Sequence, residues 1–232
     1  QMCIRDREMA AALLATRGPV LKTEGNLNNQ YGLPLTLLRL RAEHRAAVLE
    51  LGMSAAGELR ALVAVARPDV AVITRIAPVH LEFFPSLDAI AEAKAEVLEG
   101  LAPRGTAVLN GDDPRVARIG ERYSGRVVWF GRGSGRDVSC ADERQNGAGT
   151  RLTLLLPGQA VAARLPLVGP HFVENLLAAA AVAHVLGVPT DALAEAVGSL
   201  GAARHRGEVL RLGQDVVVLD DCYNSSPAAL EA

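Results

Sequence analysis

Cysteine is scarce in this sequence, and the spacing of the few that occur argues against two kinds of protein. The three cysteines, Cys3, Cys140 and Cys222, are odd in number and lie far apart. Disulfide-stapled secreted domains carry an even set, and Cys-rich zinc sites carry closely spaced pairs. The pattern therefore favours neither a disulfide framework nor such a zinc site, and it fits a reducing cytosol.

Long apolar runs and clustered positive charge are also missing. The longest apolar run, LLAAAAVAHVLGV, is shorter than the roughly 20 residues that a membrane-spanning helix needs, so we expect a core helix and no membrane insertion. The N-terminal stretch QMCIRDRE carries charges where a signal peptide has an apolar centre. The formal net charge is −2 without a basic stripe, which argues against a nucleic-acid partner. We expect a cytoplasmic protein that acts on a small or acidic metabolite.

What the sequence does contain is an alternation of short strand patterns and longer helix patterns. Apolar runs of the kind that parallel sheets bury occur at 46–52, 69–76, 105–113 and 126–131. Helical spacing fills two of the intervals, 56–68 and 86–101, and Ser86 is a suitable N-cap for the second. The fold class predicted is α/β, with a mostly parallel sheet flanked by helices.

The second half of the chain predicts a different arrangement. Residues 131–150 are rich in glycine and polar groups and no helix pattern follows them, so we expect a solvated connection, then a small antiparallel hairpin over 151–167. Helix patterns at 174–187 and 189–200 lead through a basic link to a strand pattern at 215–221. Because the pattern stops inside what resembles a new helix, we expect a truncated chain.

Polar side chains follow the carboxyl ends of the predicted strands, where ligands gather in parallel sheets. Glu50 ends the first strand, His80 follows the second, and the third is closed by Asn110, Asp112 and Asp113. A carboxylate and an imidazole from neighbouring strand ends are able to share one divalent cation. The residues alone are also explained, and more simply, by Glu50 as a helix cap and His80 as a hydrogen-bonded loop histidine, and both explanations stay open.

Lys94 is unusual because helical spacing puts it on the apolar stripe of 86–101 and not with Glu92, Glu96 and Glu99. Two explanations stay open. In one, the ammonium group reaches solvent along its own alkyl chain. In the other, burial lowers the pKa and leaves a neutral amine that reacts with carbon dioxide, and the resulting anionic carbamate is a candidate metal ligand.

Five segments in this order carry a family resemblance: TEGNLNNQYGLPLTLLRL, AVLELGM, HLEFFPSLDAIAEAKAEVLEGL, GTAVLNGDDP and LDDCYNSSP. Together they resemble the ATP-dependent Mur ligases of peptidoglycan synthesis, over nearly the whole chain from about Glu8. The asparagine-rich segment favours the members that add D-alanyl-D-alanine to a UDP-N-acetylmuramoyl tripeptide. Members that add the third stem-peptide residue, folylpolyglutamate synthases and non-catalytic nucleotide-sugar binding modules remain alternatives.

The resemblance implies a domain organisation and a chemistry. Residues 1–202 would form the central, P-loop NTPase-like ATPase domain without its phosphate loop, and 203–232 would begin the C-terminal domain. Glu50, His80 and carbamoylated Lys94 would form the catalytic group and hold Mg²⁺. The tripeptide carboxylate would attack the γ-phosphate of ATP to give an acyl phosphate, and the amine of D-alanyl-D-alanine would then displace phosphate. We expect a monomer.

Two further sets of residues take their roles from the resemblance. The residues expected at ATP are Asn175, Arg206 and Asp221. The residues expected at the nucleotide-sugar peptide are Thr23, Asn26, Asn28 and Asn29. Without the resemblance, an amide-rich turn that satisfies its own backbone explains the last set.

The sequence also departs from the family. Its phosphate loop, which ends in Gly-Lys-Thr before the first helix, is replaced here by QMCIRDR, so we expect residues 1–7 to be foreign sequence. Pro170 and Phe172 flank His171 where the family usually has Arg and Asn. We therefore expect these 232 residues by themselves to be catalytically inactive.

Overall fold

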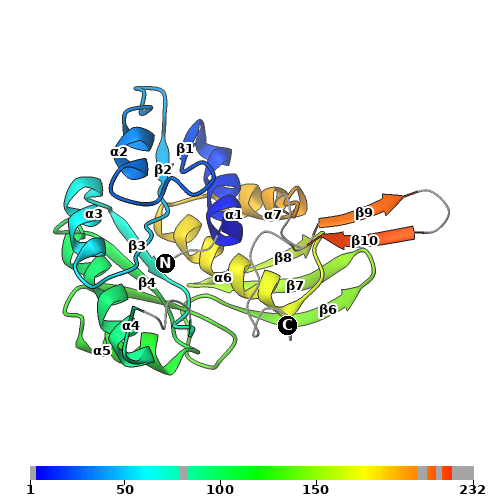
Figure 1. Ribbon diagram of the computed structural model, residues 1–232. Helices are drawn as coiled ribbons and strands as arrows, with labels where there is room; N and C mark the ends of the chain where they lie inside the picture. The colour runs from blue at the N-terminus through cyan, green and yellow to red at the C-terminus, as the bar shows by residue number, and fades with distance from the viewer. Residues whose placement is uncertain (1–3, 79–82, 203–207, 213–215, 221–232) are drawn as a thin grey trace.

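The computed structural model describes residues 4–78, 83–202, 208–212 and 216–220 (Figure 1). Parallel strands alternate with helices in the first part of the chain, and an antiparallel sheet lies beside them. The α/β class and the mostly parallel, helix-flanked architecture predicted from the sequence are confirmed.

The α-helices within these residues are α1 (Ile4–Leu14), α2 (Gly32–Leu37), α3 (Glu58–Ala66), α4 (Leu87–Ala95), α5 (Pro114–Arg122), α6 (Pro170–Val185) and α7 (Thr190–Gly198). Short 3-10 helices are η1 (Ala15–Arg17) and η2 (Glu96–Gly100). The strands are β1 (Val20–Lys22), β2 (Ala46–Val48), β3 (Val70–Ile73), β4 (Thr106–Asn110), β5 (Arg126–Phe130), β6 (Ser139–Asn146), β7 (Gly149–Leu156), β8 (Gln159–Leu165), β9 (Glu208–Leu212) and β10 (Val216–Asp220).

The parallel strands form two sheets. β1 pairs with β2, and β3, β4 and β5 pair in that order. The four apolar runs predicted as strands became β2 to β5, whereas β1 is too short to give a pattern of its own. An apolar cavity of about 320 Å³, lined by Val48, Val70 and Val72 among others, lies between β2 and β3. The two sheets are therefore separate where a single sheet was expected.

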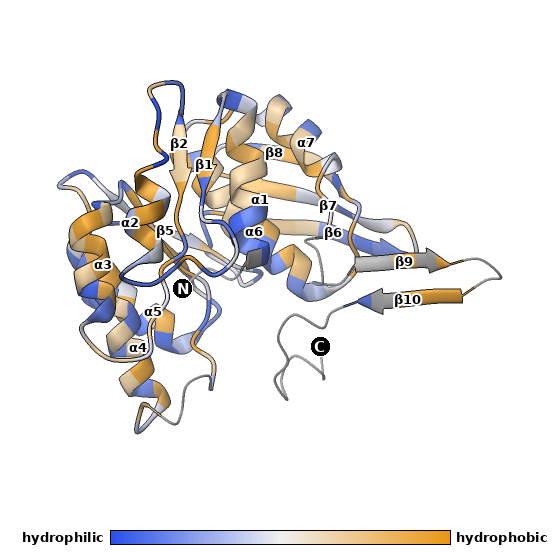
Figure 2. Ribbon diagram, turned by 45° about the horizontal axis from the view of Figure 1, so that its top comes forward, coloured by the Kyte–Doolittle hydropathy of each residue, from blue (hydrophilic) through white to orange (hydrophobic). Residues whose placement is uncertain are grey.

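Helices cover both faces of the larger parallel sheet. Val108 and Val128 pack into a core with α1 and α6, and Ala107 and Leu109 pack into a second core with α3, α4 and α5. This alternation follows from the two-residue period of a strand. All five residues of β4 are buried, as expected for a central parallel strand. Polar residues concentrate in loops such as the one between α2 and β2 (Figure 2).

The antiparallel sheet has the order β6-β7-β8. The hairpin predicted over 151–167 is confirmed by β7 and β8, whose buried residues alternate and join the core of α6. The prediction of a solvated connection over 131–150 is wrong in part, because Ser139–Asn146 pairs with β7 as β6. The residues of β6 are mostly polar and partly exposed, a composition that is typical of loops. They form a strand because their backbone hydrogen-bonds to the apolar strand β7.

The last strands, β9 and β10, pair antiparallel and extend away from the rest of the chain (Figure 1). β9 lies within the segment predicted as a basic link, so that prediction is wrong for 208–212. The predicted strand at 215–221 is confirmed over 216–220. The apolar run expected to be a core helix lies in α6 and is mostly buried. In the part of the chain that the structure describes, no helix is long and apolar enough to cross a membrane.

Candidate functional site

Glu50 follows β2 and connects three segments of the chain. Its side chain is buried, with 7% of the residue exposed. The backbone N–H of Glu50 donates to Thr23 Oγ1 at 3.0 Å, after β1. Its Oε1 accepts from Asn28 Nδ2 at 2.9 Å, and its Oε2 accepts from Arg7 Nη1 of α1 at 3.0 Å. A buried carboxylate is thus placed where a strand, a polar loop and a helix meet.

Two asparagines of the polar loop have different partners. Asn29 Oδ1 accepts from the backbone N–H groups of Tyr31 and Gly32 at 3.1 and 2.9 Å, so this amide satisfies the start of α2. Asn28 instead directs its amide nitrogen to Glu50. One asparagine therefore stabilises the loop, and the other joins the loop to the buried carboxylate.

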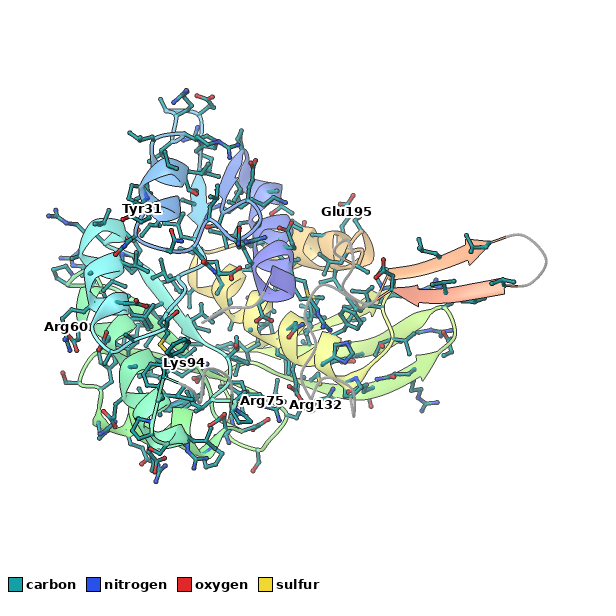
Figure 3. The ribbon with its side chains drawn as sticks, viewed as in Figure 1. Tyr31, Arg60, Arg75, Lys94, Arg132 and Glu195 are labelled. Carbon is teal, nitrogen blue, oxygen red and sulfur yellow. The ribbon has the colours of Figure 1, made fainter. Side chains whose placement is uncertain are left out.

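A cavity of about 510 Å³ opens between this loop and the start of α3. Asn28 and Asn29 line it, and Tyr31, which is 71% exposed, lies among the lining residues (Figure 3). Thr23 is fully buried and, like Asn26, is not among the lining residues. Of the four residues predicted to contact a nucleotide-sugar peptide, two therefore face an open cavity in this structure.

Lys94 is buried in α4, with 4% of the residue exposed, so its ammonium group does not reach solvent. Its Nζ donates to the carbonyl oxygen of Arg75, just after β3 (Figure 3). Burial lowers the pKa of Lys94 to about 8, and the nearby charge of Asp113 acts in the opposite direction. The snorkelling explanation is wrong, and a part of the amine population is neutral near physiological pH.

The backbone after β3 that accepts the Lys94 hydrogen bond is fixed by residues at the end of β4 and just beyond it. Asn110 Nδ2 donates to the carbonyl oxygen of Thr74 at 2.8 Å, and Asp113 Oδ2 accepts from the Ile76 N–H at 2.8 Å. Asp112 turns the other way and accepts from the Gly133 N–H at 3.1 Å in the loop after β5. Asn110 and Asp113 therefore position the backbone to which Lys94 donates.

We expect Asp113→Ala to lower the free energy of unfolding by about 2 kcal/mol, since it removes a helix cap and leaves buried N–H groups unpaired. Asp113 Oδ1 accepts from Arg115 and Val116 N–H at 2.9 and 3.1 Å, in addition to Ile76. Denaturant unfolding of the purified chain measures the change. Asp88→Ala is the control because that carboxylate makes only exposed ion pairs; equal losses for both variants would contradict the capping role.

Glu96 is a buried acidic residue that the sequence pattern grouped with the exposed Glu92 and Glu99. Only 6% of it is exposed, and its carboxylate accepts from the N–H groups of Gly57 at 2.7 Å and Arg60 at 3.2 Å. It therefore caps the start of α3 from another helix. Glu96 is the first residue of η2, where the α-helix gives way to 3-10 geometry, and no local sequence signal indicates its burial.

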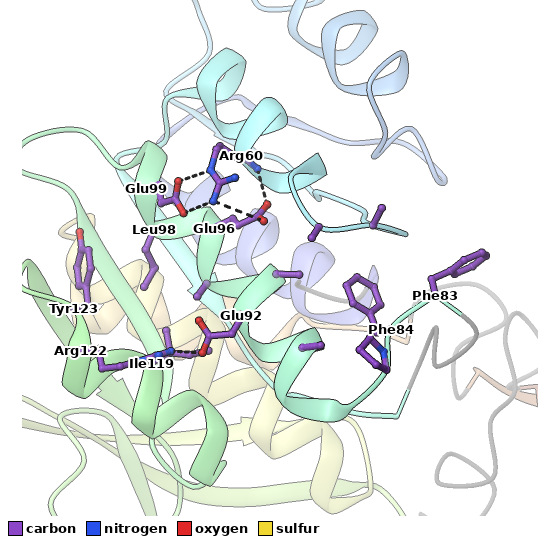
Figure 4. A pocket seen from close by; sticks show the side chains of 16 residues that line it. Arg60, Phe83, Phe84, Glu92, Glu96, Leu98, Glu99, Ile119, Arg122 and Tyr123 are labelled. Atoms are coloured by element: carbon purple, nitrogen blue, oxygen red, sulfur yellow. Dashed lines mark hydrogen bonds and ion pairs between the residues drawn. The ribbon is translucent and has the colours of Figure 1, made fainter.

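A larger cavity of about 770 Å³ lies between α3, α4 and α5 (Figure 4). Its charged rim is paired internally: Arg60 with Glu99 at 2.6 Å, and Arg122 with Glu92 at 2.6 Å. None of the predicted site residues that the structure describes lines this cavity. It is therefore separate from the group around Glu50.

The arrangement of strands, helices and polar strand ends matches a known family. Residues 7–183 match the Mur ligase middle domain. The chain belongs to the Mur ligases. The match extends over more than half of the chain, so the family does not depend on one motif.

Several Mur ligases are similar to this chain, which spans about half the length of the curated relatives it matches. It is 36% identical over 228 residues to the UDP-N-acetylmuramoyl-tripeptide–D-alanyl-D-alanine ligase of Escherichia coli (strain K12), covering 97% of this chain and 50% of the relative. For the protein of that name from Bacillus subtilis (strain 168), identity is 35% over 226 residues, with 97% and 48% covered.

Solved Mur ligase structures agree in fold. The crystal structure of MurF from Acinetobacter baumannii superposes with a TM-score of 0.92 and 33% identity, covering 98% of this chain and 50% of that one. The MurF ligase from Thermotoga maritima, in complex with ADP, gives a TM-score of 0.85 and 30% identity, with 98% and 52% covered.

Of the other residues with predicted Mur ligase roles, the structure describes Asn175 but not His80, Arg206 or Asp221. Asn175 on α6, with its amide oriented to satisfy its neighbours, donates to Asp6 Oδ1 at 2.7 Å and to the carbonyl oxygen of His171 at 3.1 Å. His80, Arg206 and Asp221 lie outside the described residues. The convergence of Glu50, His80 and Lys94 on one cation therefore stays a prediction, as do the foreign origin of residues 1–7 and the boundary at residue 202.

The donors around Glu50 do not fit a divalent metal ion as they stand. Both carboxylate oxygens of Glu50 accept N–H donors, from Asn28 and Arg7, and the Lys94 amine donates to a backbone carbonyl. Among the residues that the structure describes, no group of three or more His, Cys, Asp or Glu side chains is placed to hold a metal. The surroundings of Glu50 fit the guanidinium that is already there.

Proposed function

We propose that this chain is the middle part of an ATP-dependent amide ligase that adds D-alanyl-D-alanine to a UDP-N-acetylmuramoyl tripeptide in peptidoglycan synthesis. The observation that carries the proposal is the cavity of about 510 Å³ bordered by Asn28 and Asn29, which Asn28 joins to the buried carboxylate of Glu50. The Escherichia coli and Bacillus subtilis relatives, which carry the name of this activity, support the choice of substrates. We further propose a cytoplasmic monomer.

The reaction proposed has two steps. A carboxylate oxygen of the tripeptide attacks the γ-phosphorus of ATP, the bond from that phosphorus to the bridging oxygen breaks, and ADP leaves. The amine of D-alanyl-D-alanine then attacks the acyl carbon, the carbon–oxygen bond to phosphate breaks, and phosphate and a proton leave. Both steps bring charged groups together, so orientation and cationic groups lower the barrier.

The proposed roles of residues follow the two substrates. The peptide set is Thr23, Asn26, Asn28 and Asn29, and the ATP set is Asn175, Arg206 and Asp221. The ADP-bound Thermotoga maritima structure supports a nucleotide in the family. We propose that Glu50, His80 and Lys94 would hold Mg²⁺ in the full-length protein, where the expected foreign residues 1–7, and with them the Arg7 guanidinium, would be absent. Residues 1–202 would form the central domain and 203–232 would begin the next one.

Asn28→Ala tests this function through the substrate that the cavity would hold. In the full-length protein containing this chain, we expect the KM for the tripeptide to rise by about 10-fold, because one hydrogen-bonding amide is lost at the cavity wall. Asn146→Ala, which removes the same group from the last residue of β6, is the matched control. A KM that is unchanged in Asn28→Ala would contradict the proposed peptide site.

By itself, the chain should release no phosphate from ATP above the level of its Lys94→Ala variant, with both peptide substrates present. A non-catalytic nucleotide-sugar binding module would also release no phosphate. A ligand-binding experiment is therefore needed to distinguish such a module from a ligase fragment. Thermal shift compares ATP with Mg²⁺ against UDP-sugar ligands, because a ligand that binds the folded state raises the melting temperature. Stabilisation by UDP-sugars, together with a full-length protein that does not ligate, would favour the binding module.

A further inference from the structure

Gly52 lies two residues after Glu50 and packs closely against the side chain of Asn28. We propose that Gly52 is a positioning residue, whose lack of a side chain lets the Asn28 amide bind Glu50 and present itself to a peptide group in the neighbouring cavity. The inference rests on the proposed function for the choice of a peptide as the ligand. It goes beyond that function because it assigns a role to a residue without a functional group.

The segment that carries Glu50 and Gly52 holds Asn28 at two points. The Gly52 N–H donates to the backbone carbonyl oxygen of Asn28 at 2.7 Å. Asn28 Nδ2 donates to Glu50 Oε1 at 2.9 Å. The first bond fixes the backbone of the polar loop beside residue 52, and the second fixes the direction of the side chain. Asn28 therefore cannot move away from residue 52 without losing one of these bonds.

Position 52 has no room for a side chain while Asn28 keeps this orientation. A Cβ atom on Gly52 would lie 2.9 Å from Asn28 Oδ1, 3.0 Å from its Cγ and 3.2 Å from its Nδ2. Non-bonded carbon atoms pack at about 3.5–4.0 Å, so a methyl group here would displace the amide. The short Asn28 side chain yields by rotating about its own bonds, which directs Nδ2 away from Glu50.

The orientation of Asn28 determines what its amide offers to a ligand. Asn28 and Gly52 both line the cavity of about 510 Å³. A side-chain amide has two N–H donors and a carbonyl acceptor, and Glu50 accepts from one of the donors. The second N–H and the oxygen are complementary to the C=O and N–H groups of a peptide bond. A peptide in the cavity therefore meets a correctly oriented amide only while residue 52 is glycine.

Gly52→Ala in the full-length protein tests the inference through the tripeptide substrate. We expect the KM for the tripeptide to rise by about 10-fold with little change in kcat, because a contact used throughout binding is lost. Gly52→Ala combined with Asn28→Ala should give the KM of Asn28→Ala alone, since the displaced amide is then absent. Gly147→Ala is the matched control, because a Cβ atom there would meet no heavy atom of the described residues within 4 Å.

Thermal unfolding of the purified chain tests the same contact without any substrate. Gly52→Ala should lower the melting temperature by about 3 °C, the scale expected for one lost hydrogen bond in a chain of this size. The double variant should melt where Asn28→Ala melts, because removing the amide makes room for the methyl group. Additive effects of the two substitutions in either measurement overturn the inference, as does a Gly52→Ala variant that matches Gly147→Ala. The melting temperatures do not depend on ligation, so either proposal can fail alone.

Discussion

Replacing Lys94 with alanine in the full-length protein should lower the rate of ligation by about 10- to 100-fold, the scale found for residues that orient a metal site. The physical reason is the burial of this amine, whose pKa of about 8 leaves a neutral fraction able to take up carbon dioxide as a carbamate. We therefore expect the activity of the unchanged protein to depend on bicarbonate. A short carboxylic acid such as acetate should restore part of the activity of Lys94→Ala, because it supplies the missing carboxylate.

The control for this experiment is the other lysine of the chain. Lys22 has a side chain that is 44% exposed and pairs with Glu8, so Lys22→Ala should retain activity and show no response to acetate. Initial rates of ADP formation with saturating substrates measure all variants. Full activity of Lys94→Ala in bicarbonate-free buffer would reject the carbamate role.

Lys94 should also make the stability of the chain depend on pH. Its pKa is about 8 in the folded chain, against 10.5 for a solvated lysine such as that of the unfolded chain. Between these values the unfolded chain binds more protons, so the free energy of unfolding rises with pH in this window. From pH 7 to pH 9.5 the contribution of Lys94 should grow by about 2 kcal/mol, because the cost of a buried ammonium group is removed.

Comparison with Lys94→Met isolates this contribution from other titrating groups. The unchanged chain should gain stability relative to the variant as pH rises from 7 to 9.5, and denaturant unfolding at both values measures the difference. The methionine variant should be the more stable protein at pH 7, since it fills the same space without a charge. Parallel stability curves for the two proteins would show that Lys94 is not desolvated.

The parallel part of the fold follows from the sequence because its strands have strong local patterns. β4 is buried along its whole length and has an apolar centre, Ala107–Leu109. Ser86 caps α4 as predicted, accepting from the Ala89 N–H at 3.1 Å. β6 was not predicted because its polar residues become a strand only beside β7. A strand or helix with a clear local pattern can be predicted from its own residues. A strand that forms only by pairing with a distant segment cannot.

The same distinction applies to the candidate site. The sequence singles out Glu50 and Lys94, both of which are buried, because one follows a strand and the other interrupts an apolar stripe. Glu96 was missed because its role as a cap depends on the packing of α3 against η2. Arg7 was missed because residues 1–7, which include the start of α1, did not follow the family pattern, yet its guanidinium is paired with Glu50. The positions of Glu96 and Arg7 both depend on contacts with residues far away in the sequence.

The most direct test of the account is steady-state ADP release by the full-length protein with ATP, the UDP-N-acetylmuramoyl tripeptide and D-alanyl-D-alanine. We predict sustained ADP release only when both peptide substrates are present, with one ADP formed for each new peptide bond. Sustained ADP release that does not require D-alanyl-D-alanine, or that requires a single free amino acid in its place, would contradict the proposal that the full-length protein adds this dipeptide.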